Sequence, residues 1–145
     1  MVIGAASPRD LPQVRTLLGR HDLPLDGVAE SVQTMVVARD HSQVVGVAAL
    51  ELYPDGALLR SVAVDPAFHG LRLGHRLTEA ALQMARDKDI ETVYLLTTTA
   101  ERFFPKFGFQ PITRADVPAS VQTSVEFRSA CPASAVVMRK RLTAE

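Results

Sequence analysis

The stretch Leu58 to Met84 decides the fold, and it begins Leu-Leu-Arg-Ser-Val-Ala-Val-Asp-Pro-Ala-Phe-His-Gly-Leu-Arg-Leu-Gly-His-Arg-Leu. An apolar, β-branched run is typical of a strand, the Asp-Pro pair ends it, and a glycine-bearing loop leads into a run with helical spacing. At a helix N-terminus, backbone N–H groups without helical partners and the positive end of the helix dipole face the loop. The stretch therefore predicts a strand–loop–helix unit that binds a phosphate or pyrophosphate.

Composition restricts the class of protein. The 145 residues suit one domain, 1–145, and 47% apolar with 22% charged residues is ordinary for a globular protein in water. Sixteen Lys and Arg balance sixteen Asp and Glu, so no overall charge favours a nucleic acid or a membrane surface. No apolar run reaches transmembrane length and no leader-like segment opens the chain, which predicts a cytoplasmic location. Cys131 is the only cysteine, which excludes an intrachain disulfide and a Cys-rich metal site.

The first part of the chain predicts a strand, a helix and a hairpin. Val2–Ala6 is a short apolar segment typical of an edge strand. An N-cap serine, a proline at the first helical position and apolar residues at helical spacing predict a helix over Ser7–Gly19. His21–Glu30 is either a loop or a short second helix beside a substrate pocket. Two apolar runs, Met35–Ala38 and Val44–Leu52, flank five other residues and predict an antiparallel hairpin.

The central part continues with two strands and a helix. Tyr53–Gly56 has the composition of a turn, and Ala57–Val64 supplies the next strand. Apolar residues at helical spacing predict a helix from Gly70 to about Lys88. Thr92–Thr98 is mostly apolar, as is typical of a strand buried on both faces.

The last part of the chain closes the fold. Thr99–Lys106 predicts a short helix that ends at Phe107–Phe109, whose glycine can take a left-handed conformation. Gln110–Ser134 contains three prolines and is expected to be mostly loop, with a short helix near Ala119–Ser124. Ala135–Leu142 is expected to be the final strand. This order of elements predicts an α/β (α+β) domain in which helices flank a mixed, mostly antiparallel central sheet.

Two motifs resemble those of the GNAT N-acetyltransferases. Val62–Pro66 (Val-Ala-Val-Asp-Pro) followed by His69–Gly74 (His-Gly-Leu-Arg-Leu-Gly) is similar to motif A, commonly Arg/Gln-x-x-Gly-x-Gly/Ala after a strand. Thr97–Phe109 is similar to motif B, commonly Asn-x-x-Ala-x-x-Phe-Tyr-x-x-x-Gly-Phe. The motifs occur in the family's order and separation, and the expected elements match over nearly the whole chain. The resemblance implies the GNAT acyltransferase fold and acetyl-coenzyme A as the acetyl donor.

A narrower resemblance concerns the acceptor. Leu59–Val64, Leu95–Glu101 and Cys131–Ala135 are similar to segments of the arsenic-resistance-associated N-acetyltransferases. The Leu-Thr-Thr-Thr-Ala run in the second segment is also similar to the acetyltransferase domain of N-acetylglutamate synthase. Both relatives imply an acceptor with an α-amino group and an acidic side chain, such as glutamate, phosphinothricin or arsinothricin. Dimers are common in the family, so a homodimer is an open alternative to a monomer.

Three positions depart from the family's pattern. Arg72 stands at the second-to-last glycine of motif A, where its side chain either crowds the path to the pyrophosphate, points away, or contacts a phosphate itself. His69 replaces the usual Arg or Gln. Phe104 stands where many relatives have a tyrosine that protonates the departing thiolate, which excludes tyrosine acid catalysis from this position.

The resemblance implies a row of cofactor contacts. Pantetheine would follow the backbone of Val62 and Val64, and a Val62 N–H freed where the strand splays would polarise the acetyl carbonyl. Thr97 is either a hydrogen-bond partner of pantetheine or a strand-forming threonine, and Phe104 is expected to line the thioester end of the cleft. The loop residues expected around the pyrophosphate are His69, Gly70, Leu71, Arg72, Leu73, Gly74 and His75.

Charged residues are the candidates for the acceptor side. Arg60 lies in an apolar strand, where a charge is unfavourable unless it is paired or faces a cavity, and a guanidinium suits a carboxylate; the alternative is a solvated edge position. Arg114 is a second candidate for acceptor binding and otherwise a plain loop residue. Glu51 is the candidate general base, acting through water, and otherwise a solvated strand-end carboxylate. Glu126 is a comparable candidate. The four histidines lack metal-ligand spacing and are expected at the surface, so no metal is predicted.

These features predict direct, sequential acetyl transfer to the amine of a small acceptor. Holding both substrates in one complex supplies roughly 7–11 kcal/mol of barrier lowering in well-oriented cases, so no covalent intermediate is needed. One alternative is a non-catalytic GNAT-like module that binds or senses a ligand, which Arg72 and Phe104 favour. Another is a protein N-acetyltransferase, which needs an open peptide groove. The expected partner is a small molecule, without nucleic acid, membrane or metal.

Overall fold

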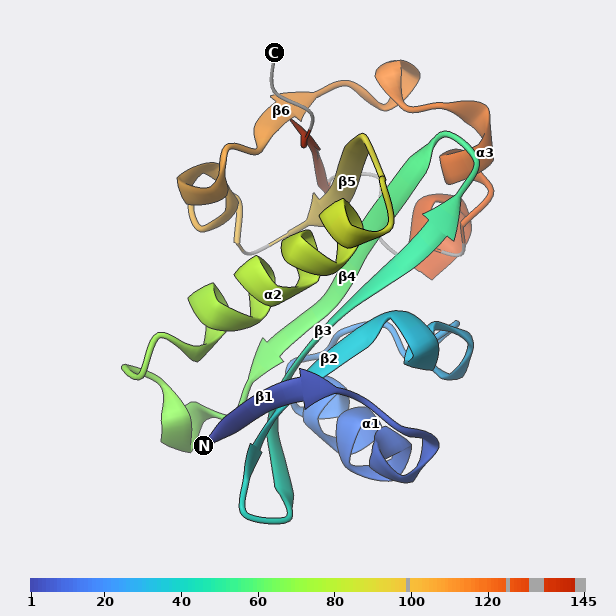
Figure 1. The fold of residues 1–145 in the computed structure, drawn as a ribbon. Helices are drawn as coiled ribbons and strands as arrows, with labels where there is room; N and C mark the ends of the chain where they lie inside the picture. Colours follow the sequence, from blue (N-terminus) through green and yellow to red (C-terminus); the bar gives the residue numbers. More distant parts are fainter. Residues whose placement is uncertain (99, 125, 131–134, 143–145) are drawn as a thin grey trace.

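A single mixed sheet forms the centre of the molecule. The computed structural model describes residues 1–145 except 99, 125, 131–134 and 143–145. Within these residues seven strands form one sheet in the order β1-β2-β3-β4-β5-β7-β6 (Figure 1). The strands are β1 (Val2–Ala5), β2 (Met35–Asp40), β3 (Gln43–Tyr53), β4 (Gly56–Val64), β5 (Thr92–Thr97), β6 (Gln110–Ile112) and β7 (Val136–Arg141). Only the β4–β5 pairing among these is parallel, which confirms the expected mixed, mostly antiparallel sheet.

Helices cover both faces of this sheet. Helix α2 (Leu73–Asp87) lies across β2, β3 and β4, and α1 (Leu11–Arg20) packs on the opposite face (Figure 1). Side chains alternate along β2, so that Val37 joins the core under α1 while Val36 and Ala38 join the core under α2. The remaining helical segments are short: η1 (Pro8–Asp10), η2 (Ala29–Thr34), η3 (Pro66–Phe68), η4 (Phe104–Phe107), η5 (Arg114–Asp116), α3 (Ala119–Gln122) and η6 (Glu126–Ala130).

Local sequence signals account for the first elements. The edge strand at the N-terminus is confirmed as β1. The helix expected from Ser7 begins as a 3-10 turn, in which the Ser7 N–H donates to Asp10 Oδ2 at 2.8 Å, and becomes α-helical at Leu11. The β2–β3 hairpin, the turn before β4 and the final strand β7 are confirmed as well. The segment after α1 consists of loop and turns and ends in η2.

The start of α2 corrects the sequence prediction. The helix was expected from Gly70 but begins at Leu73. Gly70 has φ +92° and Arg72 has φ +58°, and these left-handed conformations cannot continue into a right-handed helix. The loop therefore extends to the first turn of α2.

Two segments after β5 differ from the prediction in part. The short helix expected over Thr99–Lys106 is present only as the 3-10 helix η4, after a turn, and Gly108 ends it in the predicted left-handed conformation at φ +95°. Ring contacts among Phe103, Phe104 and Phe107 pack this segment. Strand β6 was expected to be loop because it contains a proline. Pro111 is tolerated there because β6 is an edge strand.

The sheet opens between β4 and β5. Their parallel pairing among the described residues covers only Ala57 with Val93 and Leu58 with Tyr94. On the other side of β4, the register with β3 shifts between Val47 and Ala49, which leaves Ser61 and Val62 facing one residue of β3. This is a β-bulge, and Ser61 takes φ +60° in it. Beyond Leu58 the two strands diverge.

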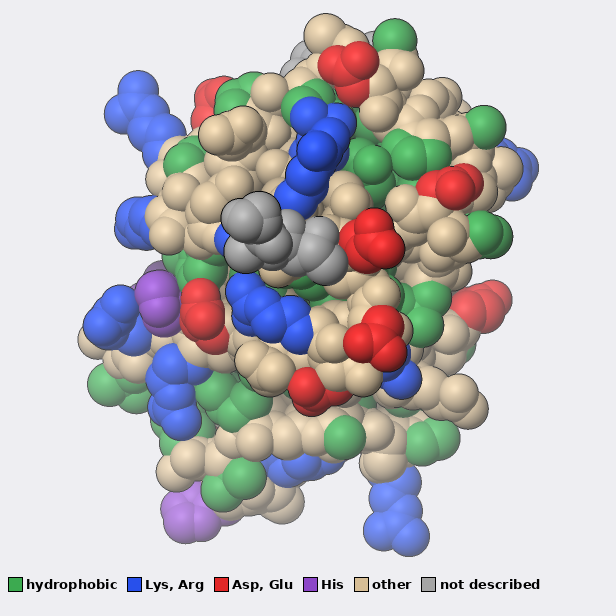
Figure 2. All heavy atoms as spheres, turned by 45° about the horizontal axis from the view of Figure 1, so that its top comes forward, with side chains coloured by type: hydrophobic (Ala, Val, Ile, Leu, Met, Phe, Trp, Pro, Cys, Tyr) green, Lys and Arg blue, Asp and Glu red, His purple; other side chains and the backbone are tan. Residues whose placement is uncertain are grey.

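The surface carries charges of both signs. Figure 2 shows Lys and Arg side chains interspersed with Asp and Glu over the face that it presents. The balance agrees with the formal net charge of +0. No helix among the residues described has both the length and the apolar character needed to cross a bilayer.

Candidate active site

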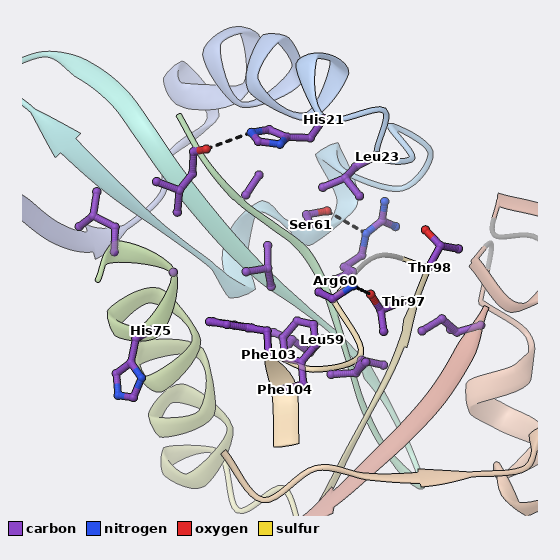
Figure 3. A pocket seen from close by; sticks show the side chains of 18 of the residues that line it. His21, Leu23, Leu59, Arg60, Ser61, His75, Thr97, Thr98, Phe103 and Phe104 are labelled. Carbon is purple, nitrogen blue, oxygen red and sulfur yellow. Dashed lines mark hydrogen bonds between the residues drawn. The ribbon is translucent and has the colours of Figure 1, made fainter. Parts of the chain in front are cut away.

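A cleft of about 920 Å³ lies where β4 and β5 diverge. Four parts of the chain line it: the loop after α1, strand β4, the loop that leads into α2, and the end of β5 with η4 (Figure 3). Glu126 of η6 completes the lining at the end away from α2. The expected cleft beside the strand–loop–helix unit is therefore present.

The loop before α2 forms one end of the cleft. His69, Gly70, Arg72, Leu73, Gly74 and His75 all line it. Leu71 does not, and its side chain is 53% exposed. The first N–H groups of α2 have no intrahelical acceptor, because the helical ladder begins with the Arg76 N–H on the Arg72 carbonyl at 3.0 Å. This end of the cleft can therefore hold an anion.

Gly74 keeps this end open. A Cβ placed on it would meet Phe103 at 3.6 Å and Val64 at 3.9 Å, which are ordinary contacts. A methyl group would fit, whereas a large side chain would extend into the cleft. A bulky side chain at this position, beside Phe103 in the cleft lining, would therefore narrow this end of the cleft.

Two imidazoles hold the carbonyl of Val64 at the end of β4. The Nε2 atoms of His21 and His69 lie 3.0 and 3.2 Å from the Val64 oxygen, and Figure 3 draws the first of these bonds. Because a carbonyl oxygen has two lone pairs, this acceptor is occupied. His21 and His75 are half-buried in the cleft lining, so the prediction that all the histidines lie at the surface was wrong for these two.

The middle of the cleft contains the predicted thioester residues. Val62 lies at the bulge of β4 and lines the cleft. Phe104 is buried in the lining and makes edge contacts with Phe103 and Phe109. Thr97 Oγ1 accepts the Ala100 N–H at 2.9 Å, so its side chain is bonded to the backbone that follows β5 (Figure 3).

Arg60 lies at the end of the cleft opposite the α2 loop, and its side chain has 0% exposure. Its Nη1 donates to Glu51 Oε2 at 2.8 Å and its Nη2 to the Pro24 carbonyl at 3.2 Å. Its Nε donates to Ser61 Oγ at 3.1 Å and lies 3.2 Å from Glu126 Oε2. The alternative that Arg60 is a solvated residue at a sheet edge is therefore wrong, because its guanidinium is enclosed by two carboxylates, a carbonyl and a hydroxyl.

Glu51 lies behind Arg60 and is not part of the cleft lining. One carboxylate oxygen accepts from Arg60, and the other accepts from the Tyr53 hydroxyl at 2.9 Å. The solvated strand-end position considered for Glu51 is wrong as well. Burial, followed by this hydrogen bond, raises the pKa of Tyr53 to about 12. The loop after α1 packs tightly here, since a Cβ on Gly27 would lie 2.9 Å from Arg60 Nη1 and 3.0 Å from Glu51 Oε2.

The other predicted residues lie elsewhere. Arg114 is outside the cleft lining, and its guanidinium carbon lies 5.7 Å from the ring centroid of Phe127. Cys131 lies outside the described residues. Within the part of the chain that the structure describes, no three His, Cys, Asp or Glu side chains gather as metal ligands.

Comparison with known proteins identifies the family. A family model described as the acetyltransferase (GNAT) domain matches residues 31–111. The chain is also 35% identical, over 130 residues, to an amino-acid acetyltransferase of Mycobacterium tuberculosis, with 83% of this chain and 74% of that protein covered. This chain belongs to the GNAT acetyltransferase family.

Solved structures share the fold of this GNAT acetyltransferase. Rv2747 from Mycobacterium tuberculosis, in complex with CoA and NLQ, is 29% identical with a TM-score of 0.84, and 99% of this chain and 100% of that chain are covered. N-acetylglutamate synthase from Neisseria gonorrhoeae, complexed with coenzyme A and N-acetyl-glutamate, has the same TM-score of 0.84 at 20% identity. That match covers 99% of this chain but 35% of the synthase, and at this identity it is a likeness of fold.

Several lining residues of this GNAT acetyltransferase were not predicted. His21 and Pro24 belong to the segment His21–Glu30, which was expected to be either a loop or a short helix beside a pocket. No residue of that segment was predicted to line the pocket. Ser61 enters the cleft through the bulge, which has no sequence signal of its own. Lys106 joins through η4. These contacts depend on how distant segments pack.

Proposed function

We propose that this GNAT acetyltransferase moves an acetyl group from acetyl-CoA to the amino group of a small amino-acid acceptor. The observation that carries the proposal is the cleft between the diverging strands β4 and β5, with the first turn of α2 at one end and charged side chains at the other. The relative of 35% identity named amino-acid acetyltransferase supports the acceptor class. The relative of 29% identity whose crystal contains CoA supports the donor.

The donor would lie along the cleft from α2 toward Arg60. The amides of the loop from Gly70 to His75 would hold the pyrophosphate, with the helix dipole favouring its charge. Arg72, which lines the cleft, would add a guanidinium contact to a phosphate. Pantetheine would bond to the backbone N–H groups of Val62 and Val64 rather than to the Val64 carbonyl, which His21 and His69 already occupy.

Transfer would be direct. The acceptor nitrogen attacks the thioester carbon, the C–S bond breaks, and the sulfur leaves as a thiol once it has gained a proton. The Val62 N–H would stabilise the oxyanion that forms on the carbonyl oxygen. Phe104, buried in the lining, would exclude water from the thioester and cannot act as an acid.

Glutamate-type acceptors, including phosphinothricin and arsinothricin, are the proposed substrates within this class. The resemblance to arsenic-resistance-associated enzymes and to N-acetylglutamate synthase supports them. An acceptor carboxylate could reach the Arg60 guanidinium only by taking the place of a present partner, because that group is fully enclosed. We assign no acceptor contact to Arg114, which lies outside the cleft lining.

A thiol-release assay with acetyl-CoA and glutamate, phosphinothricin, arsinothricin or a peptide tests the activity and the acceptor class. Turnover with the amino acids but not the peptide is the expected result. Turnover of the peptide alone would instead indicate a protein acetyltransferase. Binding of acetyl-CoA without turnover of any acceptor would indicate a ligand-binding module.

Calorimetry with Gly74→Trp tests where the donor binds. The indole would occupy the cleft beside the first turn of α2, so acetyl-CoA affinity is expected to fall by at least about 10-fold, or ~1.4 kcal/mol. Gly19→Trp is the matched control, because a Cβ on Gly19 of α1 meets nothing within 4 Å. Equal affinity in both variants would contradict the placement.

A further inference from the structure

Two carboxylates contact Arg60, and they differ in their access to the cleft. Glu51 lies behind the guanidinium, and both of its oxygens accept hydrogen bonds from protein groups, Arg60 and Tyr53. Glu126 lines the cleft itself and contacts Arg60 through Oε2 at 3.2 Å. Of the two, Glu126 is the carboxylate that an acceptor in the cleft would meet.

The charges of this cluster favour a cation. Glu51, Glu126 and Arg60 contribute two negative charges and one positive charge, so the three groups together carry one net negative charge. All three side chains are at most 14% exposed, so water screens this charge weakly. An amino acid enters as a zwitterion, and such a site attracts its ammonium group rather than its carboxylate. The other titratable side chains in the lining are His21, Asp22, His69, Arg72, His75 and Lys106.

The cluster also lies at a suitable position along β4. Arg60 is two residues from Val62 along β4, on the side away from the α2 loop, with the bulge residue Ser61 between them. A donor whose thioester reaches Val62 would thus end close to the Glu126 carboxylate. Arg60 holds that carboxylate in place from a side chain that is itself tied to Glu51 and to the Pro24 carbonyl.

We infer that Glu126 binds the acceptor ammonium and takes a proton from it, and that Arg60 is a positioning residue for this carboxylate. The inference rests on the proposed function. One N–H bond of the ammonium breaks and an O–H bond forms on Glu126, which frees the nitrogen lone pair to attack the thioester carbon. The C–S bond then breaks, a second proton passes from nitrogen to sulfur, and Glu126 releases its proton to solvent.

The test compares Glu126→Gln with Glu51→Gln across a pH series of kcat/KM. Glu126→Gln is expected to lower kcat/KM by at least about 100-fold near neutral pH, because general-base catalysis contributes about 10²–10⁴-fold. Its remaining activity should rise tenfold per pH unit, since only the amine already deprotonated in solution reacts. Glu51→Gln should lower activity less and keep the wild-type profile. Glu91→Gln, at an exposed carboxylate outside the cleft, is the unaffected control.

Other outcomes separate the inference from the proposed function. If Glu126→Gln keeps the wild-type pH profile, the inference is overturned. The proposed function still stands in that case, provided that the wild-type enzyme releases thiol. The same holds if Glu51→Gln alone changes the profile. A wild-type protein that releases no thiol with any acceptor would overturn both. Two measurements would show that the lower activity of Glu126→Gln does not come from misfolding. Its acetyl-CoA affinity should equal that of the wild type, and Glu126→Asp should partly recover the wild-type pH profile.

Discussion

At position 72, an arginine takes the left-handed backbone conformation that favours glycine. Its φ is +58°, and it precedes the first residue of α2. A non-glycine residue in this region is disfavoured by roughly 1–2 kcal/mol, which explains why the family's motif has glycine here. Arg72 also belongs to the cleft lining. Arg72 thus has an unfavourable backbone conformation, and it adds a positive charge beside the proposed pyrophosphate site.

Arg72→Gly should separate these two effects. Relief of the left-handed strain, partly offset by the greater entropy of an unfolded glycine, is expected to raise the free energy of unfolding by about 0.5–1 kcal/mol. Loss of the guanidinium should weaken acetyl-CoA binding by about 10-fold, as for one charge-assisted hydrogen bond. Urea unfolding and calorimetry measure the two. His41→Gly is the control: with φ +58° in the β2–β3 turn, it should gain stability without losing affinity. Unchanged affinity in Arg72→Gly would remove Arg72 from the phosphate site.

Tyr53 gives a pH-dependent prediction. Its pKa is raised from 10.0 to about 12, mainly by burial and then by the Glu51 hydrogen bond, so the folded state favours the neutral phenol. The stability that follows is fully present below pH 10 and is lost as the pH rises toward 12. Tyr53→Phe removes this pH-dependent contribution to stability. The difference in unfolding free energy between wild type and variant should therefore shrink as the pH rises from 10 toward 12.

Urea unfolding at a series of alkaline pH values measures the effect. Tyr94 is the other tyrosine, and Tyr94→Phe leaves Tyr53 as the sole phenol for an absorbance titration. A titration midpoint near the ordinary value for tyrosine in that variant would contradict the buried hydrogen bond to Glu51.

Among the elements, α2 packs tightly on β3 at Gly46. A Cβ on Gly46 of β3 would lie 2.6 Å from Leu77 Cδ1 of α2, so the helix approaches the strand as near as a glycine permits. This contact sets the position of α2 on the sheet, and with it the position of the loop at the mouth of the cleft. The spacing is therefore part of the site as well as of the core.

Gly46→Ala is expected to destabilise the protein by about 1–3 kcal/mol, because the methyl group forces Leu77 out of its packed position. Chemical denaturation measures the loss. Gly4→Ala on the edge strand β1 is the matched control, since nothing lies within 4 Å of its Cβ, and it should change stability by no more than about 0.5 kcal/mol. Equal effects in the two variants would show that the helix can move away without loss.

The whole molecule is organised so that one ligand would touch parts of the chain that are far apart in sequence. The cleft lining runs from His21 in the loop after α1 to Glu126 in η6. A ligand that binds only when these parts are assembled stabilises the folded state as a unit. The cleft is thus where ligand binding and global stability are coupled.

Acetyl-CoA at 100 times its Kd should raise the free energy of unfolding by about 2.7 kcal/mol. At roughly 2–4 °C per kcal/mol for a chain of this size, Tm should rise by about 5–10 °C in differential scanning calorimetry. Gly74→Trp should show a much smaller rise at the same ligand concentration. A full rise in that variant would place the donor elsewhere on the molecule.

The sequence by itself determined the strand–loop–helix unit, the hairpin, the apolar face of α2 and the family resemblance. Periodicity, capping and turn residues are local signals that act over a few neighbouring positions. Only the tertiary structure decided that α2 starts at Leu73, that β6 joins the sheet and that His21 reaches the Val64 carbonyl. It also decided the partners of Arg60. The sequence indicated that a charge in this apolar strand needs a partner or a cavity. Glu51, Pro24 and Glu126 contact Arg60 only because three separate segments pack around β4.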